Sequence, residues 1–168
     1  MSVTFLGQTV ALSGVFAQQG KLLPSFELCD KDLSDFGLDR FESKKVIINI
    51  FPSIDTPVCA NSCRAFNTLA EKMENTAVLC VSADLPFALA RFVDTDGLEN
   101  ITVASFFRHS NFANDMGVLI KEGALRGLAS RAVLVVNEFG KVIHAQLVSE
   151  ITEEPDYDSV LNVVQGEN

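Results

Sequence analysis

The most informative stretch of the sequence reads Val46-Ile47-Ile48-Asn49-Ile50-Phe51-Pro52-Ser53-Ile54-Asp55-Thr56-Pro57-Val58-Cys59. Its first six residues are nearly all apolar, which is typical of a strand buried on both faces of a sheet that helices cover. Pro52 ends this strand, and a helix is expected from about Val58 to Glu74. Apolar residues recur along that helix at steps of three and four: Cys59, Cys63, Phe66, Ala70 and Met73.

Strands and helices alternate along the rest of the chain. Further strands are expected at 3–5, 10–12, 26–28, 76–82, 131–136 and 141–147. Further helices are expected at 87–94 and from about residue 155 onward, and the segment 30–43 is polar and irregular. This order predicts a thioredoxin-like α/β fold, in which helices flank a central mixed sheet, preceded here by an N-terminal β-hairpin.

Composition narrows the class of protein. The 168 residues fit a single domain spanning 1–168, and nearly half of them are apolar. A formal net charge of −9 argues against nucleic acid as a partner, because phosphate binding requires clustered Lys and Arg. No apolar run approaches the ~20 residues of a membrane helix, and no signal peptide is evident. The four unevenly spread cysteines favour a reducing compartment, so we expect a cytoplasmic protein.

Cys59 combines several features that activate a thiol. It lies where a buried strand passes through a loop into the first turn of a helix, and free backbone N–H groups and the positive end of the helix dipole gather there. Both favour a thiolate over a thiol. Pro52 and Pro57 fix the loop, and Thr56 is close enough in sequence for its hydroxyl to reach the sulfur or an oxygen bound to it.

The spacing of Pro52, Thr56 and Cys59 resembles the active-site motif of the peroxiredoxins. The longer string 51–59 resembles the thiol peroxidase branch of that family in particular. Three other segments match the same branch: Ser82-Ala83-Asp84-Leu85-Pro86-Phe87, Gly127-Leu128-Ala129-Ser130-Arg131-Ala132-Val133, and Glu150-Ile151-Thr152-Glu153-Glu154-Pro155-Asp156-Tyr157. The resemblance therefore extends to the last helix.

This resemblance implies a role for each matched position. Cys59 is the expected peroxidatic cysteine, which attacks a peroxide oxygen and becomes a sulfenic acid. Thr56 is expected to hold the peroxide oxygens, Arg131 to stabilise the thiolate and the leaving oxygen, and Pro52 to shield the site from water. The chemistry agrees, because heterolysis of an O–O bond builds negative charge on the departing oxygen, and preorganised donors stabilise that charge.

The expected activity is reduction of hydrogen peroxide and organic hydroperoxides without a metal, flavin or haem cofactor. The resemblance implies thioredoxin or a similar dithiol protein as reductant, and a homodimer. Apolar residues around the motif favour alkyl hydroperoxides as substrates: Phe51, Ile54, Val58 and Phe92. The alternative is a peroxide-sensing or chaperone-like redox module that uses oxidation of Cys59 as a signal. A disulfide oxidoreductase is disfavoured, since no Cys-x-x-Cys motif is present.

The sequence departs from its relatives at the resolving cysteine. The thiol peroxidase branch usually carries that residue in the helix after the second core strand, where this chain has Val93. Cys63 is a possible substitute, but the enzyme can equally work with one cysteine, or Cys63 can simply pack in the helix. Side chains four apart on a helix have Cβ atoms about 5–6 Å apart, whereas a disulfide requires about 3.5–4.5 Å. A Cys59–Cys63 bond therefore requires the first turn to unwind.

The remaining cysteines, Cys29 and Cys80, lie in or beside expected strands and are interpreted as small apolar core residues. Cys59 and Cys63 alone give too few local ligands for a zinc site, which requires four.

Overall fold

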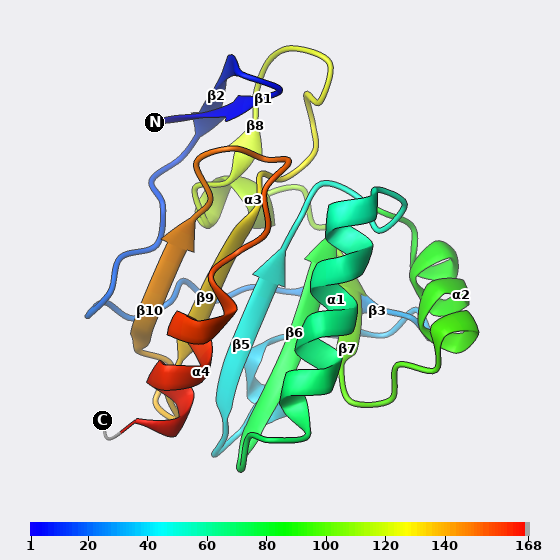
Figure 1. The fold of residues 1–168 in the computed structure, drawn as a ribbon, viewed down its shortest axis with the longest axis vertical. Helices are drawn as coiled ribbons and strands as arrows, with labels where there is room; N and C mark the ends of the chain where they lie inside the picture. Colours follow the sequence, from blue (N-terminus) through cyan, green and yellow to red (C-terminus); the bar gives the residue numbers. More distant parts are fainter. Residues whose placement is uncertain (167–168) are drawn as a thin grey trace.

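A computed structural model describes residues 1–166, and its centre is a seven-stranded mixed sheet (Figure 1). In spatial order the strands are β10 (Val142–Leu147), β9 (Ala132–Val136), β5 (Lys45–Ile50), β6 (Thr76–Ser82), β7 (Thr102–Ser105), β3 (Leu28–Asp30) and β4 (Asp35–Phe36). Strand β6 pairs parallel with both β5 and β7, and the other neighbours pair antiparallel. The predicted mixed sheet is confirmed.

Helices flank this sheet as predicted. Helices α1 (Pro57–Ala70) and α4 (Tyr157–Gln165) lie on the same face, with α1 in front of β6 (Figure 1). Their apolar residues share one core cluster with residues of α2 (Pro86–Asp96). The opposite face packs against α3 (Phe112–Asp115) and the short 3₁₀ helix η1 (Leu38–Phe41). None of the helices within residues 1–166 is long and apolar enough to cross a membrane.

Strand β5 shows why the central stretch of the sequence is apolar on both faces. Val46, Ile48 and Ile50 pack into the cluster on the α3 face, whereas Ile47 packs into the cluster beneath α1. Asn49 is the polar exception. It is fully buried and points toward α1.

The N-terminal hairpin is confirmed and forms a second, smaller sheet. Strand β1 (Ser2–Phe5) pairs with β2 (Gln8–Ser13), which also pairs with β8 (Leu119–Ile120). Apolar residues of this sheet pack against Ile151 in the loop after β10. The hairpin therefore lies next to residues 150–157, the last of the segments that resemble the family.

Several predicted boundaries differ from the structure by a few residues, and two of these differences have a clear cause. The strand predicted at 26–28 is β3 at Leu28–Asp30, because its position is set by pairing with β7, which the sequence did not predict. The helix predicted to reach Glu74 ends at Ala70, and the hydrogen bonds from Lys72 N to Leu69 O and from Met73 N to Ala70 O are turn-like i to i+3 bonds. The tighter turn leads into β6.

Candidate active site

Cys59 is the third residue of α1, so the structure confirms its predicted position in the first helical turn. Thr56 is the N-cap residue and Pro57 the first helical residue, which suits a proline because that position has no intrahelical donor to lose. The first N–H groups of the helix have no acceptor within it, and they point toward the end where Cys59 lies. The Cys59 side chain is fully buried.

Arg131 is the positively charged partner of this sulfur. It directly precedes β9 and is 1 % exposed. Its Nη2 donates to Cys59 Sγ at 3.2 Å, and its Nε donates to the carbonyl oxygen of Ile151 at 3.0 Å. Nη1 is buried and has no partner among the described residues. A fixed guanidinium therefore holds the sulfur with one nitrogen and has another available for a ligand.

The loop between β5 and α1 is held by Asp84, which follows β6. The Asp84 carboxylate accepts from Ser53 Oγ at 2.8 Å and from Ile54 N at 2.7 Å, and it also accepts from Ser82. Thr56 Oγ1 in turn donates to the carbonyl oxygen of Ser53 at 3.1 Å. With its proton committed in this way, the Thr56 hydroxyl oxygen is left to accept a hydrogen bond.

A cavity of about 200 Å³ lies against Pro52, Thr56 and Arg131. Apolar side chains make up most of its wall: Phe5, Pro57, Val58, Leu125, Leu128 and Ile151. Of the apolar residues expected around the site, Val58 lines this cavity, whereas Phe51 and Ile54 are buried in the core beneath α1. Phe92 also packs against that core and not into the cavity. The cavity is apolar, but of the four residues expected to make it so only Val58 lines it, and most of the other lining residues come from distant segments.

A hydrogen-bonded chain connects the first turn of α1 to the central strand. Asn49 Nδ2 donates to Ser62 Oγ at 3.1 Å, and Ser62 Oγ donates to the carbonyl oxygen of Cys59 at 2.8 Å. All three residues are fully buried. Such bonds are worth about 1 kcal/mol each, so they oppose unwinding of the turn.

Cys63 lies one turn deeper in α1 and is fully buried. Asn49 Nδ2 contacts its Sγ at 4.0 Å and Cys80 Sγ at 3.7 Å. Burial, reinforced by the neighbouring Cys80 thiol, raises the pKa of Cys63 well above its usual range. Val93 packs in the same core cluster as Cys59 and Cys63. All four cysteines are free thiols in this structure.

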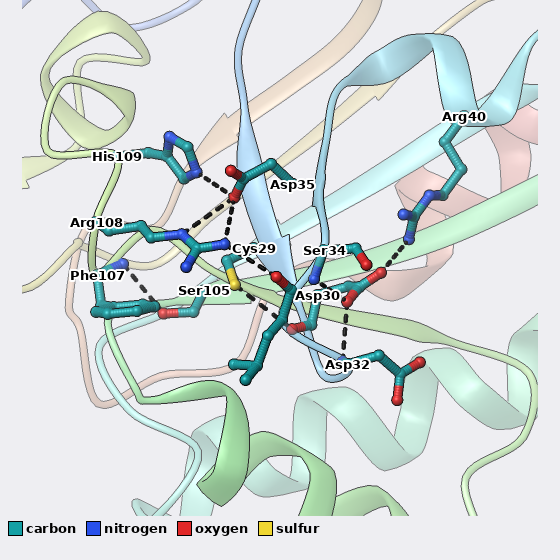
Figure 2. A network of polar contacts seen from close by, with 11 residues as sticks. Cys29, Asp30, Asp32, Ser34, Asp35, Arg40, Ser105, Phe107, Arg108 and His109 are labelled. Carbon is teal, nitrogen blue, oxygen red and sulfur yellow. Dashed lines mark hydrogen bonds and ion pairs between the residues drawn. The ribbon is translucent and has the colours of Figure 1, made fainter.

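Cys29 lies apart from this site, in β3, which β6 and β7 separate from β5. Its thiol contacts the carbonyl oxygen of Asp30 at 3.7 Å, and burial raises its pKa. Figure 2 shows the surrounding network, in which Arg108 and His109 both reach Asp35 Oδ1. The structure thus brings Cys59, Arg131, Thr56 and Pro52 together and leaves Cys29 outside.

Several residues that build the site were not expected to do so: Asn49, Ser62, Asp84, Glu150 and Ile151. A polar residue inside an otherwise apolar strand was the available signal for Asn49, since a buried amide needs a partner. Asp84 and Glu150 lie within two of the family-like segments, but the partners through which they join separate segments lie 30 to 146 residues away in the chain. Sequence spacing does not reveal such contacts.

Comparison with known proteins shows the family to which the chain belongs. The redoxin family model matches residues 18–161. A thiol peroxidase of Vibrio cholerae serotype O1 is 51 % identical over 161 residues, covering 96 % of this chain and 98 % of that protein. A peroxiredoxin-like protein from Aquifex aeolicus superposes with a TM-score of 0.92 at 41 % identity, over 98 % of this chain and 95 % of its own.

A thiol peroxidase from Chromobacterium violaceum also superposes with a TM-score of 0.92, at 25 % identity, over 98 % of this chain and 95 % of its own. Thiol peroxidases reduce peroxides at the expense of a thiol, the chemistry that a buried sulfur beside a guanidinium suits. The chain belongs to the thiol peroxidase branch of the peroxiredoxin family.

Proposed function

We propose that Cys59 is the peroxidatic nucleophile of this enzyme and that Arg131, Thr56 and Pro52 complete its catalytic site. The observation that carries the proposal is the 3.2 Å contact between Arg131 Nη2 and Cys59 Sγ in the first turn of α1. A guanidinium and a helix N-terminus both stabilise negative charge on sulfur.

Peroxide reduction then follows from the placement of donors. The Cys59 thiolate attacks the terminal peroxide oxygen, an S–O bond forms, and the O–O bond breaks. The departing oxygen takes up a proton and leaves as water or an alcohol, and Cys59 becomes a sulfenic acid. Arg131 Nη1, which is unpartnered in the described structure, can donate to that oxygen as its charge develops. Thr56 orients the peroxide, and Pro52 excludes water from the sulfur.

The sulfenic acid must next react with a thiol. We propose Cys63 as the resolving cysteine and thioredoxin or a similar dithiol protein as the final reductant. In the folded helix the Cys63 thiol is buried and protonated. Unwinding of the first turns exposes it to water, removes the burial that raises its pKa, and brings the two sulfurs within bonding distance. Attack of Cys63 on the sulfenic acid then forms a disulfide and releases water.

We further propose that the enzyme works as one domain and as a homodimer in the cytoplasm. The family model spans most of the chain, and of the proposed domain 1–168 the last two residues lie outside the described structure. Exposed apolar side chains follow the adjacent strands β6 and β7, namely Leu85, Phe87 and Phe107, and they support a self-association surface. Four free cysteines fit a reducing compartment. Sedimentation velocity would measure the oligomeric state.

The test of the catalytic assignment compares Cys59→Ser with Cys29→Ser and Cys80→Ser in a peroxide-consumption assay with catalytic amounts of protein. Cys59→Ser is expected to abolish turnover, while the other two variants retain most of it because neither sulfur contacts Arg131 or the cavity among the described residues. Substantial turnover by Cys59→Ser would refute the assignment.

A further inference from the structure

Glu150, in the loop after β10, carries an unusually complete set of hydrogen bonds for one carboxylate. Oε1 accepts from Thr4 Oγ1 at 3.0 Å and from Gly7 N at 2.9 Å. Oε2 accepts from Leu6 N at 3.3 Å and from Thr152 N and Oγ1 at 2.9 and 2.8 Å. A single side chain therefore connects the N-terminal hairpin to a loop more than 140 residues later in the chain.

The turn of the hairpin is shaped for this anion. Leu6 and Gly7 both have positive φ, 52° and 79°, which is strained backbone for the leucine. Successive residues in such conformations point their N–H groups into a shared concavity that binds anions. The Glu150 carboxylate occupies that concavity, and the main-chain bonds from Thr4 N to Ser149 O and from Ile151 N to Thr4 O flank it.

The two segments that Glu150 connects both border the catalytic site. From the loop, the Ile151 carbonyl oxygen holds Arg131 Nε, and Ile151 and Thr152 line the cavity. From the hairpin, Phe5 lines the same cavity. Figure 1 shows the hairpin next to the loop that follows β10. Phe5 lies between Thr4 and the Leu6–Gly7 turn, and Glu150 binds on both sides of it.

We propose that Glu150 is a positioning residue that fastens Phe5 against the catalytic loop and thereby sets the binding of hydroperoxides with bulky apolar tails. The proposal rests on the proposed function of Cys59. The reacting oxygens meet Cys59 and Arg131, whereas a tail extends along the apolar wall. Hydrogen peroxide has no tail, and it gains little from Phe5. The cavity, about 200 Å³, exceeds the roughly 30 Å³ that one water occupies in the liquid.

The experiment measures kcat and KM with cumene hydroperoxide and with hydrogen peroxide for Glu150→Gln, Phe5→Ala and the double variant. Each single variant is expected to lower kcat/KM for cumene hydroperoxide roughly 3- to 10-fold, mainly through KM, as expected for the loss of an aromatic contact. The rate with hydrogen peroxide falls by a smaller factor. Because Glu150 acts through Phe5, the double variant is expected to be no worse than the poorer single variant.

Glu153→Gln is the matched control. Glu153 is an exposed neighbour whose side chain makes no hydrogen bond within residues 1–166, and its replacement should leave both substrates unaffected. Additive losses in the double variant, or equal losses for the two peroxides, would overturn the proposal. Should Glu150→Gln fail to fold, Thr4→Val is the substitute, because it removes only the Thr4 hydroxyl donor. Its kcat/KM must then fall more for cumene hydroperoxide than for hydrogen peroxide. If the wild type itself turns over neither peroxide, the proposed function fails instead.

Discussion

The hydroxyl of Ser62 donates a 2.8 Å hydrogen bond to the carbonyl oxygen of Cys59. Asn49 on the central strand donates to the same hydroxyl, so the turn that carries Cys59 is fastened to the middle of the sheet. The turn cannot unwind without breaking these bonds. They therefore oppose the motion that resolution by Cys63 requires.

Peroxide treatment is expected to produce a Cys59–Cys63 disulfide, with loss of helical order around residues 58–65. Cys63 is the nearest other thiol along α1, and Val93 cannot supply one. Mass spectrometry after one equivalent of peroxide measures which sulfurs are bonded. Cys63→Ser should still reduce one equivalent, fail to turn over with thioredoxin, and over-oxidise to sulfinic acid more easily. If Cys63→Ser cycles normally, or if Cys59 bonds to another subunit, the enzyme does not resolve through Cys63.

Ser62→Ala should speed formation of this disulfide and reduce over-oxidation. The substitution removes two hydrogen bonds, each worth about 1 kcal/mol. This loss is larger than the roughly 0.5 kcal/mol that the helix gains because alanine has a higher helix propensity than serine. Rapid-quench alkylation gives the rate of disulfide formation, and hydrogen exchange reports opening of residues 58–62. Slower disulfide formation in Ser62→Ala would show that the Asn49–Ser62 chain assists resolution rather than opposing it.

Arg131→Ala should slow peroxide reduction by ~10²-fold or more, the scale of losing one preorganised oxyanion donor. It also removes the positive charge 3.2 Å from Cys59 Sγ, so the alkylation-rate profile of Cys59 should move to higher pH. Stopped-flow reduction and pH-dependent iodoacetamide labelling measure the two effects. Arg91→Ala, which removes an exposed arginine of α2 that has no side-chain hydrogen bond or ion pair among the described residues, is the control for charge alone. An unchanged rate together with an unchanged profile would place Arg131 outside the reaction.

The wild-type enzyme should show a higher kcat/KM for an alkyl hydroperoxide than for hydrogen peroxide. The cavity beside Arg131 has a mostly apolar wall, and each Å² of apolar surface removed from water contributes ~25 cal/mol. Steady-state kinetics with both peroxides and one reductant settle the comparison. Equal or better efficiency with hydrogen peroxide would contradict this prediction.

The stability that Glu150 contributes should depend on pH. Hydrogen bonds from Thr152 N and Gly7 N lower the pKa of Glu150 to about 2, compared with 4.5 for an unperturbed glutamate. A group whose pKa is depressed by folding stabilises the protein above its unfolded value and loses this contribution as pH falls through its folded value. Above pH 5 the wild type should therefore unfold at a higher denaturant concentration than Glu150→Gln. The difference between the two midpoint concentrations should shrink toward pH 2. A gap independent of pH would contradict the assignment.

Local patterns were sufficient to predict most of the central fold. The apolar run at 46–51, the proline after it and the one at Pro57 predicted β5 and the start of α1, because burial and helix capping act over a few residues. Strands β7 and β8 and helix α3 escaped prediction because each has only two to four residues. Such short elements are stabilised by their neighbours, as β7 is by β6 and β3, rather than by their own periodicity.

The residues of the site likewise fall into those that local sequence revealed and those that it did not. Pro52, Thr56 and Cys59 lie within eight residues, so their motif was visible in the sequence. A charge at the start of an apolar strand indicated that Arg131 needs a partner, but only the resemblance named Cys59 as that partner, because sheet pairing between β5 and β9 brings the two together. The roles of Asn49 and Glu150 depend on side-chain contacts across the fold. The peroxidase interpretation is confirmed by the comparisons, whereas the resolving role of Cys63 stays a prediction.

The position of Arg131 immediately before β9 also has a consequence during biosynthesis. Cys59 leaves the ribosome 72 residues ahead of Arg131 and 92 ahead of Ile151, whose carbonyl oxygen orients the guanidinium. Antiparallel pairing of β9 with β5 is therefore the event that brings Arg131 to the sulfur. A nascent chain that has not yet reached Arg131 carries Cys59 without its cationic partner, so the contact between the guanidinium and the sulfur forms only after these later residues have been made.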